Sequence, residues 1–116
     1  MRLDEALKIG REVDTLLAAH NAAAGRAHWS LRDVAQGLAG DVGELNRIAM
    51  AHDGLRDLDE VESRLRHEIA DCFWSLLMVC DRAGVDLAEV YAEQMQALAL
   101  RLSSAPSLRS ADEARP

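Results

Sequence analysis

The chain has 116 residues and a formal net charge of −7, and its composition is rich in apolar residues but poor in aromatic ones. A chain of this length forms one domain with a modest core. The acidic charge and the lack of any Lys/Arg-rich run argue against a nucleic-acid-binding surface. Because no apolar run of about 18 residues and no signal peptide is found, we expect no membrane span. Cys72 and Cys80 are expected to be reduced core residues, which fits a cytoplasmic protein.

The first half of the chain predicts two helices. Residues 3–20 carry four leucines and one valine at helical spacing, and residues 21–28 are small and polar, which is typical of a loop or a frayed helix end. The second predicted helix covers residues 31–52, with Ser30 as its N-cap and Asp33 as the capping-box partner. Three glycines within it leave one strip of the helix without side chains, with room for a close neighbour or a ligand: Gly37, Gly40 and Gly43.

The second half of the chain predicts two more helices. The third begins after Asp57 or Asp59, since both have capping-box spacing, and it ends near residue 83 at Gly84. The fourth follows its N-cap Asp86, has Glu89 at the third helical position, and continues to about residue 102.

These elements predict an all-α fold, an antiparallel four-helix bundle that occupies residues 1–102. Ser, Pro, Arg and Asp predominate afterwards, so residues 103–116 are expected to form a disordered tail. The third helix reads I-A-D-C-F-W-S-L-L-M-V-C from Ile69 and is apolar almost all round, which is typical of a buried helix. We expect part of it to contact a second subunit in a homodimer or homotetramer.

Two pairs of carboxylates stand out in the central helices. Asp41 and Glu44 form a D-x-x-E pair, and Glu68 and Asp71 form an E-x-x-D pair. Residues three apart share one face of a helix, and the interval between the pairs allows one helix to end and the next to return antiparallel. Four converging carboxylates repel one another unless a cation binds them, and such hard oxygen ligands suit Mg²⁺, with Mn²⁺ as an alternative.

The position of Asp71 strengthens this interpretation. It lies inside the apolar third helix, where burying a bare carboxylate costs several kcal/mol. The alternative is that the acids face solvent or pair with nearby arginines, of which Arg47, Arg64 and Arg66 are closest in sequence. The mirrored arrangement of two pairs favours a metal site.

The motifs G-D-V-G-E-L, E-I-A-D-C-F-W-S-L-L and A-G-V-D-L-A-E-V-Y together resemble the MazG-like all-α nucleotide pyrophosphohydrolases. That family includes MazG, the all-α dCTPases and the dimeric dUTPases, and its motif is E-x-x-E followed by E-x-x-D on two helices of a bundle. The resemblance covers residues 29–95.

By that resemblance, Asp41, Glu44, Glu68 and Asp71 match the Mg²⁺ ligands. The implied reaction is hydrolysis of a nucleoside triphosphate to the monophosphate and pyrophosphate, in nucleotide-pool house-cleaning. Asp41 or Glu44 is the candidate general base.

The chain departs from the family at two places. Asp41 stands where the family usually has Glu, and Gln94 and Leu98 stand where members often carry Lys and Asn. The alternative function is therefore a catalytically reduced bundle that binds a nucleotide or a partner protein.

Two tryptophans are candidate substrate-binding residues. Trp29 precedes the second predicted helix, where an aromatic side chain of relatives can stack on a base, and Trp74 lies three residues after Asp71 on the same face. The alternative for Trp29 is a role in closing the core, and for Trp74 a core or dimer contact.

Overall fold

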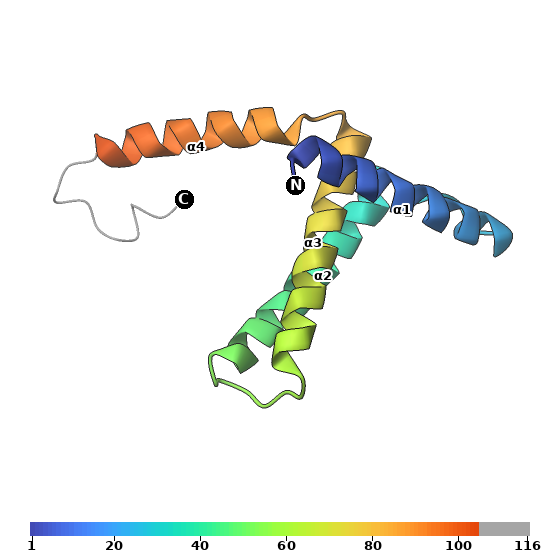
Figure 1. The fold of residues 1–116 in the computed structure, drawn as a ribbon, viewed down its shortest axis with the longest axis horizontal. Coiled ribbons are helices and arrows are strands. Elements are labelled where there is room, and N and C mark those ends of the chain that lie inside the picture. Colours follow the sequence, from blue (N-terminus) through green and yellow to red (C-terminus); the bar gives the residue numbers. More distant parts are fainter. Residues whose placement is uncertain (105–116) are drawn as a thin grey trace. The chain divides into compact units, whose positions relative to one another are not determined.

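The computed structural model of the chain describes residues 1–104, which form four helices and no strand. The predicted all-α class is therefore confirmed. The helices are α1 (Leu3–Ala23), α2 (Leu31–His52), α3 (Val61–Ala83) and α4 (Leu87–Ser103) (Figure 1). Within this described part, no helix combines the length and the apolar character needed to cross a membrane.

The chain divides into two units. The first, Met1–Gly84, contains α1, α2 and α3, and the second begins at Val85 and contains α4. The predicted disordered tail lies outside the described residues, except that Ser103 is the last residue of α4 and Ser104 is its C-cap.

Capping interactions set the starts of α2 and α4 as predicted. The Ser30 hydroxyl accepts a hydrogen bond from the Asp33 amide at 3.2 Å, and the Asp33 carboxylate accepts one from the Ser30 amide at 2.9 Å. Asp86 accepts a hydrogen bond from the Glu89 amide at 3.2 Å. These contacts satisfy amide groups that the first helical turn leaves unpaired.

Two predicted boundaries are wrong. The N-cap of α3 is Glu60, which has φ 55° and makes no side-chain cap, so neither Asp57 nor Asp59 caps this helix. A left-handed residue just before the helix turns the chain away from the geometry in which those carboxylates would reach the first amides. At the other boundary, α1 continues through Ala23, so the loop predicted from residue 21 begins three residues later. The alanines of this stretch favour continued helix.

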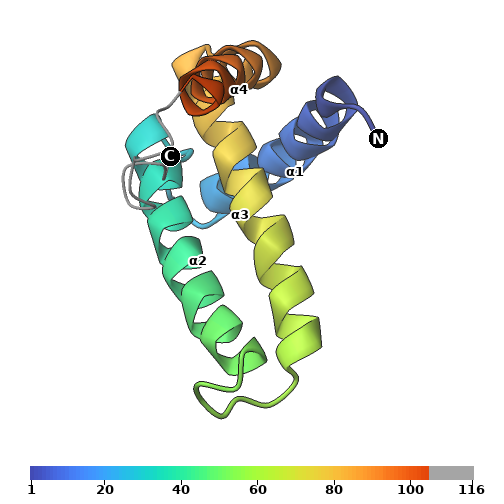
Figure 2. The same ribbon diagram turned by 90° about the vertical axis from the view of Figure 1, so that its left-hand side faces the viewer.

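In the first unit, α2 and α3 lie side by side and run in opposite directions (Figures 1 and 2). Their buried apolar residues form a small core: Val34 and Ile48 from α2, and Leu77, Met78 and Cys80 from α3.

The remaining helix of this unit, α1, crosses α3 (Figure 2). The two helices contact each other at Gly10. A Cβ atom at Gly10 would lie 3.0 Å from Cε of Met78, and the Trp74 indole N–H donates to the Gly10 carbonyl oxygen at 3.1 Å. The absence of a side chain at Gly10 therefore lets the two helices approach closely.

Within the first unit, α3 is not covered on every side. Its residues Ile69, Phe73 and Leu76 are 52%, 41% and 38% exposed. Only α1 and α2 are available to cover α3 within the first unit, and two helices cannot enclose every face of a third. An apolar outer face of α3 is left open.

Two glycine substitutions, one in α2 and one at the end of α3, test whether the surface of α2 is free of packing contacts. A Cβ atom at Gly40 would meet nothing within 4 Å, so Gly40→Ala should raise the free energy of unfolding by about 0.5–1 kcal/mol through helix propensity. Gly84→Ala should lower it by about 1 kcal/mol or more, because Gly84 has φ 68°. Urea denaturation of both variants checks the pair, and a destabilised Gly40→Ala protein would mean that another surface packs on α2.

Candidate functional site

A pocket of about 410 Å³ opens between α1, α2 and α3. Its walls come from all three helices and from the segment that precedes α2. Val13 and Leu17 of α1 form its apolar side, and Gly37 of α2 contributes open space because it has no side chain. Four residues singled out from the sequence also line it: Trp29, Asp41, Asp71 and Trp74.

The two tryptophans meet edge to face at this pocket. Their ring centroids are 6.3 Å apart with an interplanar angle of 71°. Trp74 is fixed by its hydrogen bond to Gly10, whereas Trp29 is 37% exposed. Aromatic rings held in this way offer flat apolar surface for a planar ligand.

Asp41 of α2 and Asp71 of α3 place carboxylates in the same pocket. The Ser75 hydroxyl donates a hydrogen bond to Oδ2 of Asp41 at 3.1 Å, and Ser75 also lines the pocket. Ser75 is buried and was not singled out from the sequence. Its position four residues after Asp71 on α3 is the signal that identifies it, since residues i and i+4 share a helix face.

Glu68 is the buried carboxylate of the group, with an exposed fraction of 8%. Burial raises its pKa above the usual value, and the negative charges of Asp41 and Asp71 raise it further. The same carboxylates, together with burial as the largest cause, raise the pKa of the Cys72 thiol. Three acids from the two helices therefore lie close enough to repel one another.

The prediction that Asp71 is the buried carboxylate is wrong. The Asp71 side chain is 47% exposed, and its carboxylate lies 2.9 Å from Nε2 of His67. Asp71 sits at the margin of the pocket rather than in the core, because α3 turns this face toward an opening between helices. The buried acid is its partner Glu68, three residues earlier.

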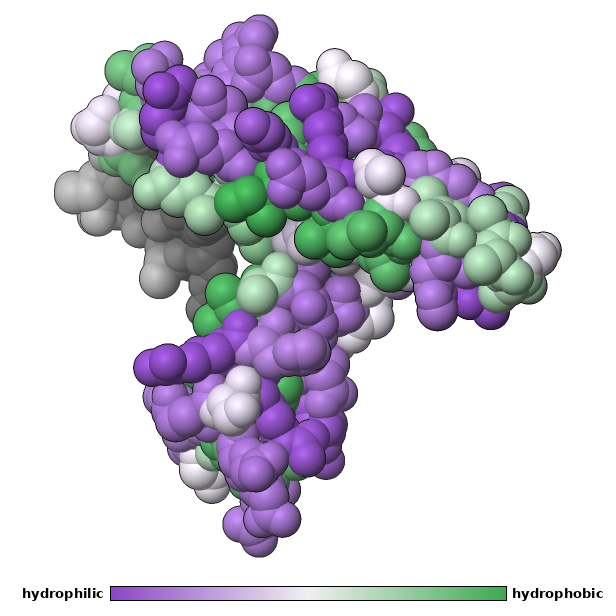
Figure 3. Space-filling model, turned by 45° about the vertical axis from the view of Figure 1, so that its right-hand side comes forward, coloured by the Kyte–Doolittle hydropathy of each residue, from purple (hydrophilic) through white to green (hydrophobic). Residues whose placement is uncertain are grey.

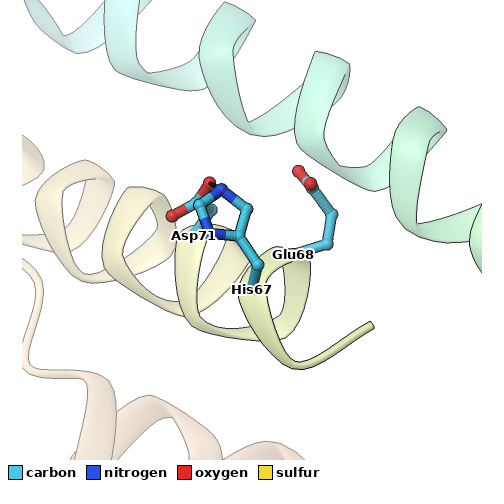
Figure 4. Close-up of side chains that lie close together, drawn as sticks. All are labelled: His67, Glu68 and Asp71. Atoms are coloured by element: carbon cyan, nitrogen blue, oxygen red, sulfur yellow. Dashed lines mark ion pairs between the residues drawn. The ribbon is translucent and has the colours of Figure 1, made fainter. Parts of the chain in front are cut away.

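His67 joins the acids of α3 (Figure 4). One ligand atom from each of His67, Glu68 and Asp71 lies within 4.8 Å of the others. Figure 4 shows Glu68 directed toward α2, while the His67 ring and the Asp71 carboxylate lie together. His67 was not predicted as a site residue, although its position four residues before Asp71 puts both on one face.

Glu44, the remaining predicted ligand, has a different partner. Its carboxylate accepts hydrogen bonds from the Arg47 guanidinium, one of them from Nε at 3.1 Å. The hydrogen bond from Arg47 lowers the pKa of Glu44. Neither Glu44 nor Glu68 lines the pocket. Glu68 interacts with Asp41 and Asp71, whereas Glu44 is held by Arg47, so the structure brings together three of the four predicted carboxylates.

The donor set at this place fits a hard divalent cation. Asp41, Glu68 and Asp71 supply carboxylate oxygens, the ligand type that Mg²⁺ and Mn²⁺ prefer. Within residues 1–104, no lysine or arginine forms an ion pair with these three acids, and His67 alone pairs with Asp71. A buried carboxylate among like charges, with no cationic side chain paired to it, is an environment that a cation stabilises.

Comparison with protein families, curated proteins and solved structures finds nothing that matches this chain.

The raised pKa of Glu68 predicts a pH-dependent gain in stability when its charge is removed. A folded-state pKa above the unfolded value means that ionised Glu68 destabilises the fold at neutral pH, and that this penalty vanishes as the pH falls. In EDTA, Glu68→Gln should melt higher than wild type at pH 7, with a difference that shrinks toward pH 4. Glu12→Gln, at an exposed site on α1, is the matched control and should change little. A Glu68→Gln protein that melts lower at pH 7 would contradict the repulsion.

Proposed function

We propose that this protein is a MazG-like, Mg²⁺-dependent nucleotide pyrophosphohydrolase that converts nucleoside triphosphates to monophosphates and pyrophosphate in the cytoplasm. The observation that carries the proposal is the pocket in which Trp29 and Trp74 lie beside the carboxylates of Asp41 and Asp71, from two helices. A planar base fits the aromatic part and a cation-bound phosphate chain fits the acidic part. The proposal includes the predicted fold, an antiparallel four-helix bundle of the MazG-like type.

Asp41, Glu68 and Asp71 would hold the cation. Mg²⁺ or Mn²⁺ bound there neutralises charge on phosphate oxygens and lowers the pKa of bound water. Neither lysine nor arginine lines the pocket as formed by the described residues. The charged side chains that line the pocket among the described residues are carboxylates, those of Asp33, Asp41 and Asp71. We therefore expect nucleotide binding itself, as well as turnover, to require the metal.

Asp41 is the better candidate for general base. Its carboxylate faces the pocket and is oriented by the Ser75 hydroxyl, while Glu44 lies outside the pocket with its charge paired to Arg47. A base must reach the proton that it removes, and a carboxylate engaged by a guanidinium is less basic. In the proposed reaction Asp41 accepts a proton from the water that attacks the α-phosphorus.

The second candidate is a catalytically reduced bundle that binds a nucleotide or a partner protein. Two observations favour it: the pairing of Glu44 with Arg47, which removes one predicted ligand, and the presence of Gln94 and Leu98 at the positions compared with family Lys and Asn. This candidate predicts metal-dependent nucleotide binding without release of pyrophosphate.

The reaction is tested with a panel of ribo- and deoxyribonucleoside triphosphates in Mg²⁺. We expect monophosphate and pyrophosphate as primary products, and loss of turnover in EDTA. Asp71→Asn should lower kcat by about 100-fold or more, the range seen when one charge-stabilising group is removed, while Asp57→Asn, in the exposed α2–α3 loop, should not. Orthophosphate as the primary product would contradict the proposal.

Melting curves separate a metal ligand from a structural residue at position 71. In EDTA, Asp71→Asn should melt no lower than wild type, because it loses like-charge repulsion and only a contact to His67, which is 72% exposed. Mg²⁺ should raise the melting temperature of wild type and have much less effect on the variant. A variant destabilised equally with and without metal would assign Asp71 a structural role instead.

We also propose that the protein assembles as a homodimer or homotetramer through the apolar outer face of α3. Ile69, Phe73 and Leu76 are exposed there, and a groove of about 180 Å³ runs beside Phe73 between α3 and α1. Figure 3 shows apolar residues exposed along one side of α1, whereas the ends of α2 and α3 at their connecting loop are mainly hydrophilic. Exposed apolar surface of this kind marks interaction sites.

Sedimentation at micromolar concentration tests the assembly. Wild type should sediment as an oligomer, and Phe73→Asp should shift it to the monomer by placing a charge on the apolar face. Leu55→Asp, at a loop residue that is 71% exposed, is the control and should leave the mass unchanged. A monomeric wild-type mass would exclude the assembly.

A further inference from the structure

A largely buried ion pair links α1 to the last turn of α3. The Arg82 guanidinium donates two hydrogen bonds to the Asp14 carboxylate, Nη1 to Oδ2 at 2.9 Å and Nη2 to Oδ1 at 2.8 Å. The two side chains are only 13% and 11% exposed. Neither residue lines the pocket, and neither takes part in the reaction proposed above.

The same guanidinium also holds the segment that enters α2. Its Nε donates to the backbone carbonyl oxygen of Trp29 at 3.1 Å, and its Nη2 lies 2.9 Å from Nε2 of His28, which accepts a hydrogen bond when the imidazole is neutral. Nε2 of His28 is also 3.1 Å from Oδ1 of Asp14. One planar group thus contacts α1 and two consecutive residues of the loop.

Trp29 is consequently fixed on both sides along the chain. Arg82 binds its carbonyl oxygen, and the next residue, Ser30, is locked by the capping box of α2. The loop before it is otherwise exposed, since every residue from Ala22 to Ser30 has an exposed side chain. The Trp29 ring meets Trp74, whose indole is bonded to Gly10 of α1. The position of Trp29 in the pocket wall therefore depends on Arg82, which does not itself line the pocket.

We infer that Arg82, with Asp14 and His28, is a positioning residue that holds Trp29 as a preorganised wall for the planar heterocycle of the ligand. The kinetic part of this inference rests on the proposed function, whereas the positioning of Trp29 does not. A wall fixed before the ligand arrives spares the ligand the entropy of ordering an exposed loop, which appears in affinity. Arg82 acts on KM through Trp29 and leaves the chemical step alone.

Arg82→Lys is the informative substitution. Lysine keeps the charge beside Asp14 but lacks the planar fork, so it cannot bind Asp14, the Trp29 carbonyl and His28 together. Arg11→Lys is the matched control, because Arg11 also joins α1 to α3, through Asp81 at 2.8 Å, and is 59% exposed. Both variants change one arginine that bridges the same two helices, and only one of them contacts Trp29.

A ligand-free measurement tests the positioning directly. In protein labelled with 5-fluorotryptophan, ¹⁹F NMR gives one resonance for each tryptophan, assigned with Trp74→Phe. We expect Arg82→Lys to shift the Trp29 resonance toward its unfolded position or broaden it, while the Trp74 resonance stays near its wild-type position, and Arg11→Lys to leave both unchanged. A Trp29 resonance unaffected by Arg82→Lys, or both resonances collapsing together, would overturn the inference. If Arg82→Lys does not fold, His28→Ala, which keeps the ion pair, is measured with the same expectations.

Kinetics then test the route through Trp29 with Mg²⁺ and the best-hydrolysed triphosphate. Arg82→Lys should raise KM by about tenfold with kcat unchanged, the scale of a lost hydrogen bond and its ordering effect. In a Trp29→Ala background the same substitution should raise KM little further, since the side chain that it positions is gone. Additive effects, or a fall in kcat alone, would overturn the inference. If no triphosphate is bound or hydrolysed, the proposed function fails and the NMR measurement decides the positioning by itself.

Discussion

The placement of α1 on α3 depends on the buried ion pair between Asp14 and Arg82. The buried residues of α1 are Gly10, Asp14 and Asn21, none of which is a large apolar side chain. Burial of apolar side chains therefore does little to fix α1. The two directional hydrogen bonds of the ion pair fix the orientation of α1 in a way that apolar contacts do not. Losing one partner of such a pair destabilises the fold because the other charge stays partly buried and unpaired. The apolar side of the pocket depends on the same contact, since Val13 and Leu17 belong to the turns of α1 on either side of Asp14.

Two buried acids of the first unit have pKa values that are shifted in opposite directions overall. At Asp14 burial raises the pKa, but the hydrogen bonds and the positive charge of Arg82 act against it, and the pKa is lowered overall. At Glu68 the neighbouring carboxylates add to the effect of burial and the pKa is raised. Acidification therefore relieves Glu68 first, and the stability contributed by Asp14 is lost only as the pH falls below the usual range of aspartate. The fold supplies an arginine counter-charge at Asp14, whereas no lysine or arginine of residues 1–104 forms an ion pair with Glu68.

Local chemistry is what the sequence predicted well. The Ser30 and Asp86 caps depend on residues three positions apart, and both formed as expected. The all-α class followed from composition and periodicity. The convergence of Asp41 with Glu68 followed from helical spacing and one antiparallel turn.

What the sequence could not predict depends on contacts between distant segments. Asp14 and Arg82 are far apart in the chain, and nothing local marks them as partners. The sequence allows Glu44 either to ligate a metal or to pair with Arg47. The side-chain rotamers decide between the two. The apolar sequence of α3 indicated that this helix is buried, but it did not indicate which elements cover it. Trp74 and Met78 face α1, Ser75 faces the acid of α2, and Phe73 faces outward. An apolar helix of this kind has a different neighbour for each face, and the outward face is the one for which the first unit offers no neighbour, which is why the proposed assembly is placed there.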